Sequence, residues 1–267
     1  MRPEYHPLTV KSSRRELLAS GAAAMTLGGG SAGIAKEPSP SPAARGTDNG
    51  SPFLFGLNTS TIREQHVPLA EEIKIAQEVG YHGMEPWMDE IQKHVAGGGT
   101  LDDLGKRFRD AGISVESVID FFEWATDDDA RRKKGLEAAR RSLETVQKIG
   151  GLRVAAPASG ATDHPVELGR LVERYAELLK IADEFGVVPM VEVWGFSKTL
   201  NKLGEAAYVA IESGHPKACV LPDVFHLYKG GSPLEGIRLL SPSAIQVFHV
   251  NDYPGSPERE KLTDADR

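Results

Sequence analysis

The sequence predicts an α/β fold in which a parallel sheet is built from repeated strand–helix units. From Phe53 onward, short apolar runs alternate with longer amphipathic segments, which is the pattern of such units. Glycines at Gly150, Gly186 and Gly214 separate three amphipathic segments from the apolar runs that follow them. The 267 residues are enough for one sizeable domain and too few for two full ones.

Seven apolar runs are the expected strands. They lie near residues 53–58, 82–86, 113–119, 152–156, 187–193, 218–222 and 244–250. Between them, residues 128–149 carry an apolar side chain every three or four positions, with charged side chains on the opposite face. Residues 165–186 show the same period and begin with Pro165, which a first helical turn tolerates. Both segments are therefore expected to be amphipathic helices whose apolar stripes belong to the core.

The number of strands bears on the architecture. A barrel of eight strand–helix units takes about 250 residues and closes only when an eighth strand covers the edges of the first and seventh. The sequence supplies seven strands. We expect a (β/α)8 barrel whose eighth βα unit is missing from this chain, so that the domain is incomplete at its C-terminus, because the strand-end residues described below need one more ligand from a next strand. The alternative is an open sheet of seven strands.

The first 35 residues predict a twin-arginine signal peptide. Arg14 and Arg15 precede a mildly apolar run of small residues from Ala19 to Ile34. This pattern predicts export, to the periplasm or beyond the cell. An ordinary amphipathic helix is the alternative, and the glycines at 28–30 disfavour it.

The rest of the chain divides into a linker and a folded domain. Residues 36–50 combine Pro, Ser, Gly and charge with almost nothing to bury, so we expect a disordered linker there. Residues 51–267 are the expected domain. The apolar run before the linker is too short and too rich in glycine for a stable membrane span, so none is expected in the mature chain.

Composition excludes several classes of protein. The 31 Lys and Arg against 38 Asp and Glu give a net charge of −7, which disfavours a nucleic-acid partner. Cys219 is the single cysteine, so no internal disulfide can form. A small-molecule partner is expected, and a homo-oligomer stays open.

Ionisable residues fall at the C-terminal ends of successive predicted strands, and in a βα barrel these ends converge on one mouth. They are Glu85, Glu192, Asp223, His226 and His249. Glu192, Asp223 and His249 fall at the same level on three consecutive strands. Two carboxylates and one imidazole suit a divalent cation such as Mn²⁺, Co²⁺, Mg²⁺ or Zn²⁺. The sequence therefore predicts a metal site, with one more ligand expected from the next strand.

The tryptophans give a second indication. Trp87, Trp124 and Trp194 each lie just past the end of a predicted strand, where they would surround the mouth and stack on the C–H faces of a sugar. Core packing is the alternative for each, because tryptophan is usually well buried. Phe121 and Phe122 are further aromatic residues that could join this ring.

The order and spacing of these residues resemble the xylose isomerase-like βα-barrel family of sugar and sugar-phosphate isomerases and epimerases. The likeness runs from Phe53 to the C-terminus. It rests on four short motifs, which are Glu85-Pro86, the glutamate of VEVWG, the Asp-x-x-His of 223–226 and the His-x-Asn-Asp of 249–252.

The resemblance implies a role for each site residue. Glu192 would bind the metal and act as acid and base, Asp223 and His249 would be ligands, and His226 would contact the substrate. Independently of the resemblance, Glu85 and the three tryptophans are expected to line the substrate site, because they lie at or just past strand ends. The family has a glutamate on strand eight, which this chain lacks, and a substrate-holding arginine, for which Arg267 is the candidate.

The expected function is a divalent-metal-dependent sugar isomerase or epimerase. Such an enzyme abstracts a proton next to a carbonyl and forms an enediolate, whose charge the cation stabilises. If the strand-eight glutamate is essential, the chain as printed is inactive. Two alternatives are a lyase that dehydrates a keto-polyol or sugar acid and a non-catalytic sugar-binding barrel. A three-zinc DNA-repair endonuclease is disfavoured, because the strand ends supply too few ligands.

Overall fold

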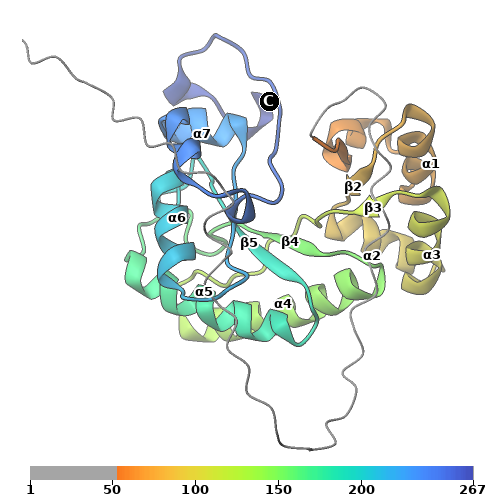
Figure 1. The fold of residues 1–267 in the computed structure, drawn as a ribbon, viewed down its shortest axis with the longest axis horizontal. Coiled ribbons are helices and arrows are strands. Elements are labelled where there is room, and N and C mark those ends of the chain that lie inside the picture. The colour runs from red at the N-terminus through yellow and green to blue at the C-terminus, as the bar shows by residue number, and fades with distance from the viewer. Residues whose placement is uncertain (1–52, 267) are drawn as a thin grey trace, which may run out of the picture. The chain divides into compact units, whose positions relative to one another are not determined.

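A computed structural model of the chain describes residues 53–266 (Figure 1). The predicted signal peptide, the predicted linker and Arg267 lie outside the described residues. Six strands lie within them, namely β1 (Gly56–Asn58), β2 (Gly83–Glu85), β3 (Ser114–Val115), β4 (Arg153–Ala156), β5 (Val188–Glu192) and β6 (Val220–Leu221).

All the strand pairs are parallel, as the sequence predicts. The strands form two three-stranded sheets in the orders β1-β2-β3 and β4-β5-β6. Backbone hydrogen bonds from Val118 N to Arg153 O and from Ala155 N to Val118 O connect the segment after β3 to β4. The predicted α/β fold of alternating strands and helices is confirmed.

The predicted seventh strand at 244–250 forms no regular ladder. It pairs with β6 and the residues after β6 only through two isolated parallel bridges, Val220 with Ile245 and Asp223 with His249. Pro222 lies between these bridges and has no N–H to donate, so a continuous ladder cannot form there. The segment nevertheless lies beside β6, which is the order that the sequence predicts.

Helices alternate with the strands and cover them (Figure 1). The α-helices are α1 (Leu69–Val79), α2 (Met88–Ala96), α3 (Leu101–Ala111), α4 (Asp129–Lys148), α5 (Leu168–Asp183), α6 (Leu203–Glu212) and α7 (Val224–Gly230). Short 3₁₀ helices are η1 (Thr59–Gln65), η2 (Leu234–Leu239), η3 (Pro242–Ala244), η4 (Arg259–Lys261) and η5 (Asp264–Asp266). No helix in the described part of the chain is long and apolar enough to span a membrane.

The helix ends follow local chemistry. The helix predicted at 128–149 is α4, and the side chain of Asp128 caps it by accepting a hydrogen bond from Arg131 N. The helix predicted at 165–186 is shorter, because α5 begins only at Leu168, after the capping carboxylate of Glu167. Pro165 therefore lies before the helix and not in its first turn.

Both faces of the parallel strands are buried, as parallel sheets require. The larger apolar cluster contains the apolar side chains of the amphipathic helices, including Leu143 of α4 and Leu178 of α5, which are fully buried. A second, smaller cluster consists of residues in or next to the strands, namely Ile119, Ala155, Met190, Cys219 and Leu221. Packing on both faces holds the strands firmly, and so fixes the position of their carboxyl ends.

Candidate functional site

The predicted ionisable residues lie at the carboxyl ends of the strands. Glu85 is the last residue of β2, and Glu192 is the last residue of β5. Asp223 follows β6 and is the N-cap of α7, and its backbone bridges to His249. Glu85, Glu192 and Asp223 are all buried, with exposed fractions of 5%, 4% and 0%. Burying three carboxylates is costly unless they meet positive charge, hydrogen-bond donors or a metal ion.

His249 lies between two of these carboxylates. Its Nε2 is 2.7 Å from Glu85 Oε2, and its Nδ1 is 3.6 Å from Asp223 Oδ2. Burial alone would lower the pKa of His249, but the charges of Glu85 and Glu192 and the neighbouring Asp223 carboxylate, as a hydrogen-bond acceptor, raise it well above its usual range. The influence of Glu192 on His249 ties the third carboxylate to the same charge cluster. We call Glu85, Glu192, Asp223 and His249 the strand-end cluster.

Asp223 is held by donors on both oxygens. Its Oδ1 accepts from His226 N at 2.9 Å, which caps α7, and its Oδ2 accepts from Asn251 Nδ2 at 2.8 Å. Asn251 is fixed in turn, because its Oδ1 accepts from Phe225 N at 3.1 Å. Burial would raise the pKa of Asp223, but His249 and His226 hold it at about 2. The carboxylate is therefore ionised at neutral pH.

A second asparagine holds Glu85. Asn58, the last residue of β1, donates from Nδ2 to Glu85 Oε2 at 2.7 Å. Burial would raise the pKa of Glu85, but the charge of His249 and the hydrogen bond from Asn58 lower it. Sequence reasoning missed both Asn58 and Asn251. Asn58 could have been found as a polar residue at the end of an apolar run, and Asn251 as a member of the His-x-Asn-Asp motif.

The donor types of the cluster suit a divalent cation. Glu192, Asp223 and His249 offer two carboxylates and an imidazole, all within the buried strand ends. Within residues 53–266, however, no three His, Cys, Asp or Glu side chains are already converged on one point as metal ligands. In the structure His249 instead pairs with Glu85, and two of the three predicted ligands, Asp223 and His249, face each other.

Aromatic side chains form a continuous row beside the cluster. Ring centroids are 5.4 Å apart for Trp87 and Phe121, 5.7 Å for Phe121 and Trp194, and 4.9 Å for Trp194 and Phe196. Phe196 then meets the ring of His226 at 5.4 Å. Phe121 and Phe196 are each 40% exposed, so the row presents apolar ring surface to solvent. We call these four residues and His226 the aromatic row.

Trp124 does not belong to that row, and its predicted place in the substrate site is wrong. Its side chain is fully buried, and its ring packs against Tyr175 with centroids 5.9 Å apart. The indole Nε1 donates to Pro157 O at 2.7 Å, so the polar atom is satisfied inside the protein. Phe122 is also buried, at 5% exposure. The core alternative is the correct one for both residues.

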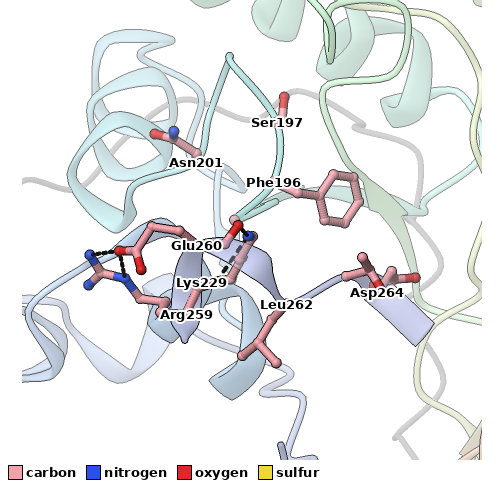
Figure 2. Close-up of a pocket in the computed structure, with 10 residues that line it drawn as sticks. Phe196, Ser197, Asn201, Lys229, Arg259, Glu260, Leu262 and Asp264 are labelled. Carbon is pink, nitrogen blue, oxygen red and sulfur yellow. Dashed lines mark hydrogen bonds and ion pairs between the residues drawn. The ribbon is translucent and has the colours of Figure 1, made fainter. Parts of the chain in front are cut away.

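The C-terminal residues pack next to His226. Asp264 Oδ1 lies 3.9 Å from His226 Nε2, and the buried Leu262 anchors the segment. Lys229 of α7 donates to the carbonyl oxygens of Arg259 at 3.0 Å and Glu260 at 2.8 Å (Figure 2). Between this segment and the loop after β5 lies a hollow of about 560 Å³. Its lining is Gly195, Phe196, Ser197, Asn201, Lys229, Arg259, Glu260, Leu262, Thr263 and Asp264.

Comparison with known proteins identifies a family and several relatives that this chain resembles. A family model described as xylose isomerase-like TIM barrel matches residues 73–267. An inosose isomerase of Bacillus velezensis is 23% identical over 205 residues, covering 74% of this chain and 72% of that protein.

Two solved structures share the fold. The IolI protein with a bound zinc atom has a TM-score of 0.72 and 22% identity, covering 80% of this chain and 78% of its own. A D-psicose 3-epimerase in the presence of D-fructose has a TM-score of 0.62 and 19% identity, covering 77% of each chain. From the extent of the family match, together with the parallel strands and their polar carboxyl ends, the chain belongs to the xylose isomerase-like TIM barrel family.

Proposed function

We propose that this protein is a divalent-metal-dependent isomerase or epimerase of a small sugar or polyol. The observation that supports this most is the strand-end cluster, in which two buried carboxylates, Glu85 and Asp223, face one imidazole and a third, Glu192, ends the neighbouring strand β5. Charges in such an environment are costly for stability, so they favour a functional role. The isomerase and epimerase activities named for the relatives point to the same class of reaction.

Glu192, Asp223 and His249 would hold the cation. When bound, it would stabilise negative charge that develops on substrate oxygens during proton abstraction. Glu192 would then remove and return the proton next to the carbonyl, because a carboxylate held in a buried site can act as base and then as acid. Asp223, ionised and fixed by His226 N and Asn251, would keep its position throughout.

The aromatic row would bind the sugar. Exposed ring faces can stack on the C–H face of a pyranose or an inosose, while polar groups nearby bond its hydroxyls. Trp194 and Phe121 supply such faces, and His226 lies at the end of the row. The hollow between Phe196 and Asp264 would admit the remainder of a small polyol.

The test is proton exchange by the full chain. The protein is stripped of metal, reloaded with Mn²⁺, Co²⁺, Mg²⁺ or Zn²⁺, and incubated in D₂O with unphosphorylated ketoses and an inosose. We expect metal-dependent exchange of a carbon-bound proton for deuterium, with a rearranged product of unchanged composition. Absence of exchange with every sugar and metal would contradict the proposal, and loss of water from the product would favour the dehydratase alternative.

We further propose that residues 1–35 are a twin-arginine signal. Replacing Arg14 and Arg15 together by lysine should retain the protein in the cytoplasm of a bacterial host. The measurement is cell fractionation followed by immunoblotting of the full-length protein. Equal export of the lysine variant and the unaltered protein would count against this signal.

A further inference from the structure

The two nitrogens of His249 face different carboxylates. Nε2 lies at hydrogen-bond distance, 2.7 Å, from Glu85 Oε2. Nδ1 lies 3.6 Å from Asp223 Oδ2, which is longer than a direct hydrogen bond. Glu85 is therefore the carboxylate nearer to the ring and contacts Nε2, while Nδ1 is turned toward a carboxylate of the predicted metal site.

We propose that Glu85 is a positioning residue that holds the Nε2–H of His249, so that Nδ1 is the nitrogen that binds a divalent cation. This inference rests on the proposed metal-dependent function and gives Glu85 a different role from the predicted substrate contact. A histidine that binds metal commonly donates its other N–H to a carboxylate, which fixes its tautomer and strengthens the ligand. When a cation binds, Nδ1 gives up any proton to solvent and Nε2 keeps its own.

One carboxylate oxygen of Glu85 is itself held by a side-chain amide. Asn58 Nδ2 donates to Glu85 Oε2 at 2.7 Å. The orientation of the Asn58 amide follows from its oxygen, which accepts from Ser60 N at 3.0 Å and from Trp87 Nε1 at 3.1 Å. Because the amide oxygen is occupied by these two donors, the amide nitrogen faces Glu85 and donates to it. With 5% of Glu85 exposed, little water competes for these bonds.

The same arrangement is repeated on the other side of the ring. Asn251 Nδ2 donates to Asp223 Oδ2, the oxygen nearer to His249, at 2.8 Å. Each carboxylate that faces His249 is therefore oriented by an asparagine from a neighbouring strand end. The two amides bond the same oxygens that face the ring, so each fixes which oxygen of its carboxylate meets His249.

A Glu85→Gln variant tests the role through binding of Zn²⁺ alone, measured by competition with a chromophoric chelator on the full chain. We expect Zn²⁺ affinity to fall by about 10- to 100-fold, as for other partners of metal-binding histidines. In the Zn²⁺-loaded wild-type protein, ¹⁵N NMR of the imidazole should show metal on Nδ1 and a slowly exchanging proton on Nε2 of His249. That proton should exchange faster in the variant.

Glu116→Gln is the matched control. Glu116 is a partly buried glutamate that pairs with Arg153 Nη1 at 3.2 Å, and Arg153 begins β4, at the strand end away from the cluster. This variant should bind Zn²⁺ as the wild type does. If Glu85→Gln does not fold, Asn58→Ala removes a single bond to Glu85 and should weaken Zn²⁺ binding by about 3- to 10-fold.

The outcomes separate the inference from the function on which it rests. Equal affinity of Glu85→Gln and Glu116→Gln for Zn²⁺, or metal on Nε2 of His249 in the wild type, would overturn the positioning role alone. A wild-type chain that binds no Zn²⁺ would overturn the proposed function and this role together.

Discussion

The chain buries polar side chains in two regions and satisfies them in two different ways. In the interior, Trp124 Nε1 donates to Pro157 O at 2.7 Å, and the Tyr175 hydroxyl donates to Pro189 O at 2.8 Å. In the strand-end cluster, side-chain charges face one another, as His249 does with Glu85. A bond to backbone ties two elements of the fold together. Buried charges that face one another add little net stability but concentrate reactive groups. Substitutions in the two regions should therefore separate stability from activity.

The largest effect is expected from Glu192→Gln. Turnover should fall by about 10²- to 10⁴-fold, because the proposed acid and base is lost while its size is kept. The free energy of unfolding should stay the same or rise, since a buried carboxylate is replaced by a neutral amide. Metal-dependent deuterium exchange and urea unfolding measure the two quantities. Glu116→Gln is the control, and equal activity of the two variants would contradict the assignment.

Trp124→Ala should do the opposite. We expect it to lower the free energy of unfolding by about 3–5 kcal/mol, because a large, fully buried side chain leaves a cavity against Tyr175. The fraction that remains folded should bind Zn²⁺ like the wild type. Urea unfolding checks the first expectation and chelator competition the second. A loss below about 1 kcal/mol would mean that this indole is not part of the core.

Glu72 of α1 is a buried carboxylate away from the strand-end cluster, and it sharpens the comparison. It is 1% exposed, and burial together with the charge of Glu90 raises its pKa to about 7, against the opposing charge of Arg63. The folded state then binds more protons than the unfolded state between pH 4.5 and about 7, so stability falls as the pH rises through this range.

Glu72→Gln should remove that pH dependence. At about 1.4 kcal/mol per pKa unit, the wild type should lose about 2–3 kcal/mol relative to the variant between the two ends of the range. Urea unfolding at a series of pH values, on both proteins, is the measurement. Parallel stability curves for the two proteins would show that Glu72 is solvated in the folded state.

Sequence reasoning succeeded where position along a strand decides the outcome. Glu85 and Glu192 end their strands in the structure, because the apolar runs before them fix where each strand stops. It failed where a contact spans many residues. Trp124 is buried because Pro157, 33 positions later, offers its carbonyl to the indole, and no local pattern encodes that meeting. The prediction of a regular seventh strand failed for a local reason, since Pro222 has no N–H to donate to a ladder of hydrogen bonds.

The smallest effect on stability is expected from Trp194→Ala, which completes the comparison between two tryptophans that both follow a strand. Trp194 is partly exposed and packs on Phe121 and Phe196, which are themselves exposed, so its loss opens no closed cavity. The free energy of unfolding should change by about 1 kcal/mol or less.

If the aromatic row binds the sugar, the Trp194→Ala substitution should raise KM by about 5- to 30-fold with kcat little changed, because ring stacking contributes to the ground state and the transition state alike. Steady-state kinetics with the exchanging sugar decide the matter, and Trp124→Ala, assayed on its folded fraction, should leave KM unaltered. A kcat that falls with KM constant would instead place Trp194 close to the reacting carbon, as a residue that acts on the chemical step.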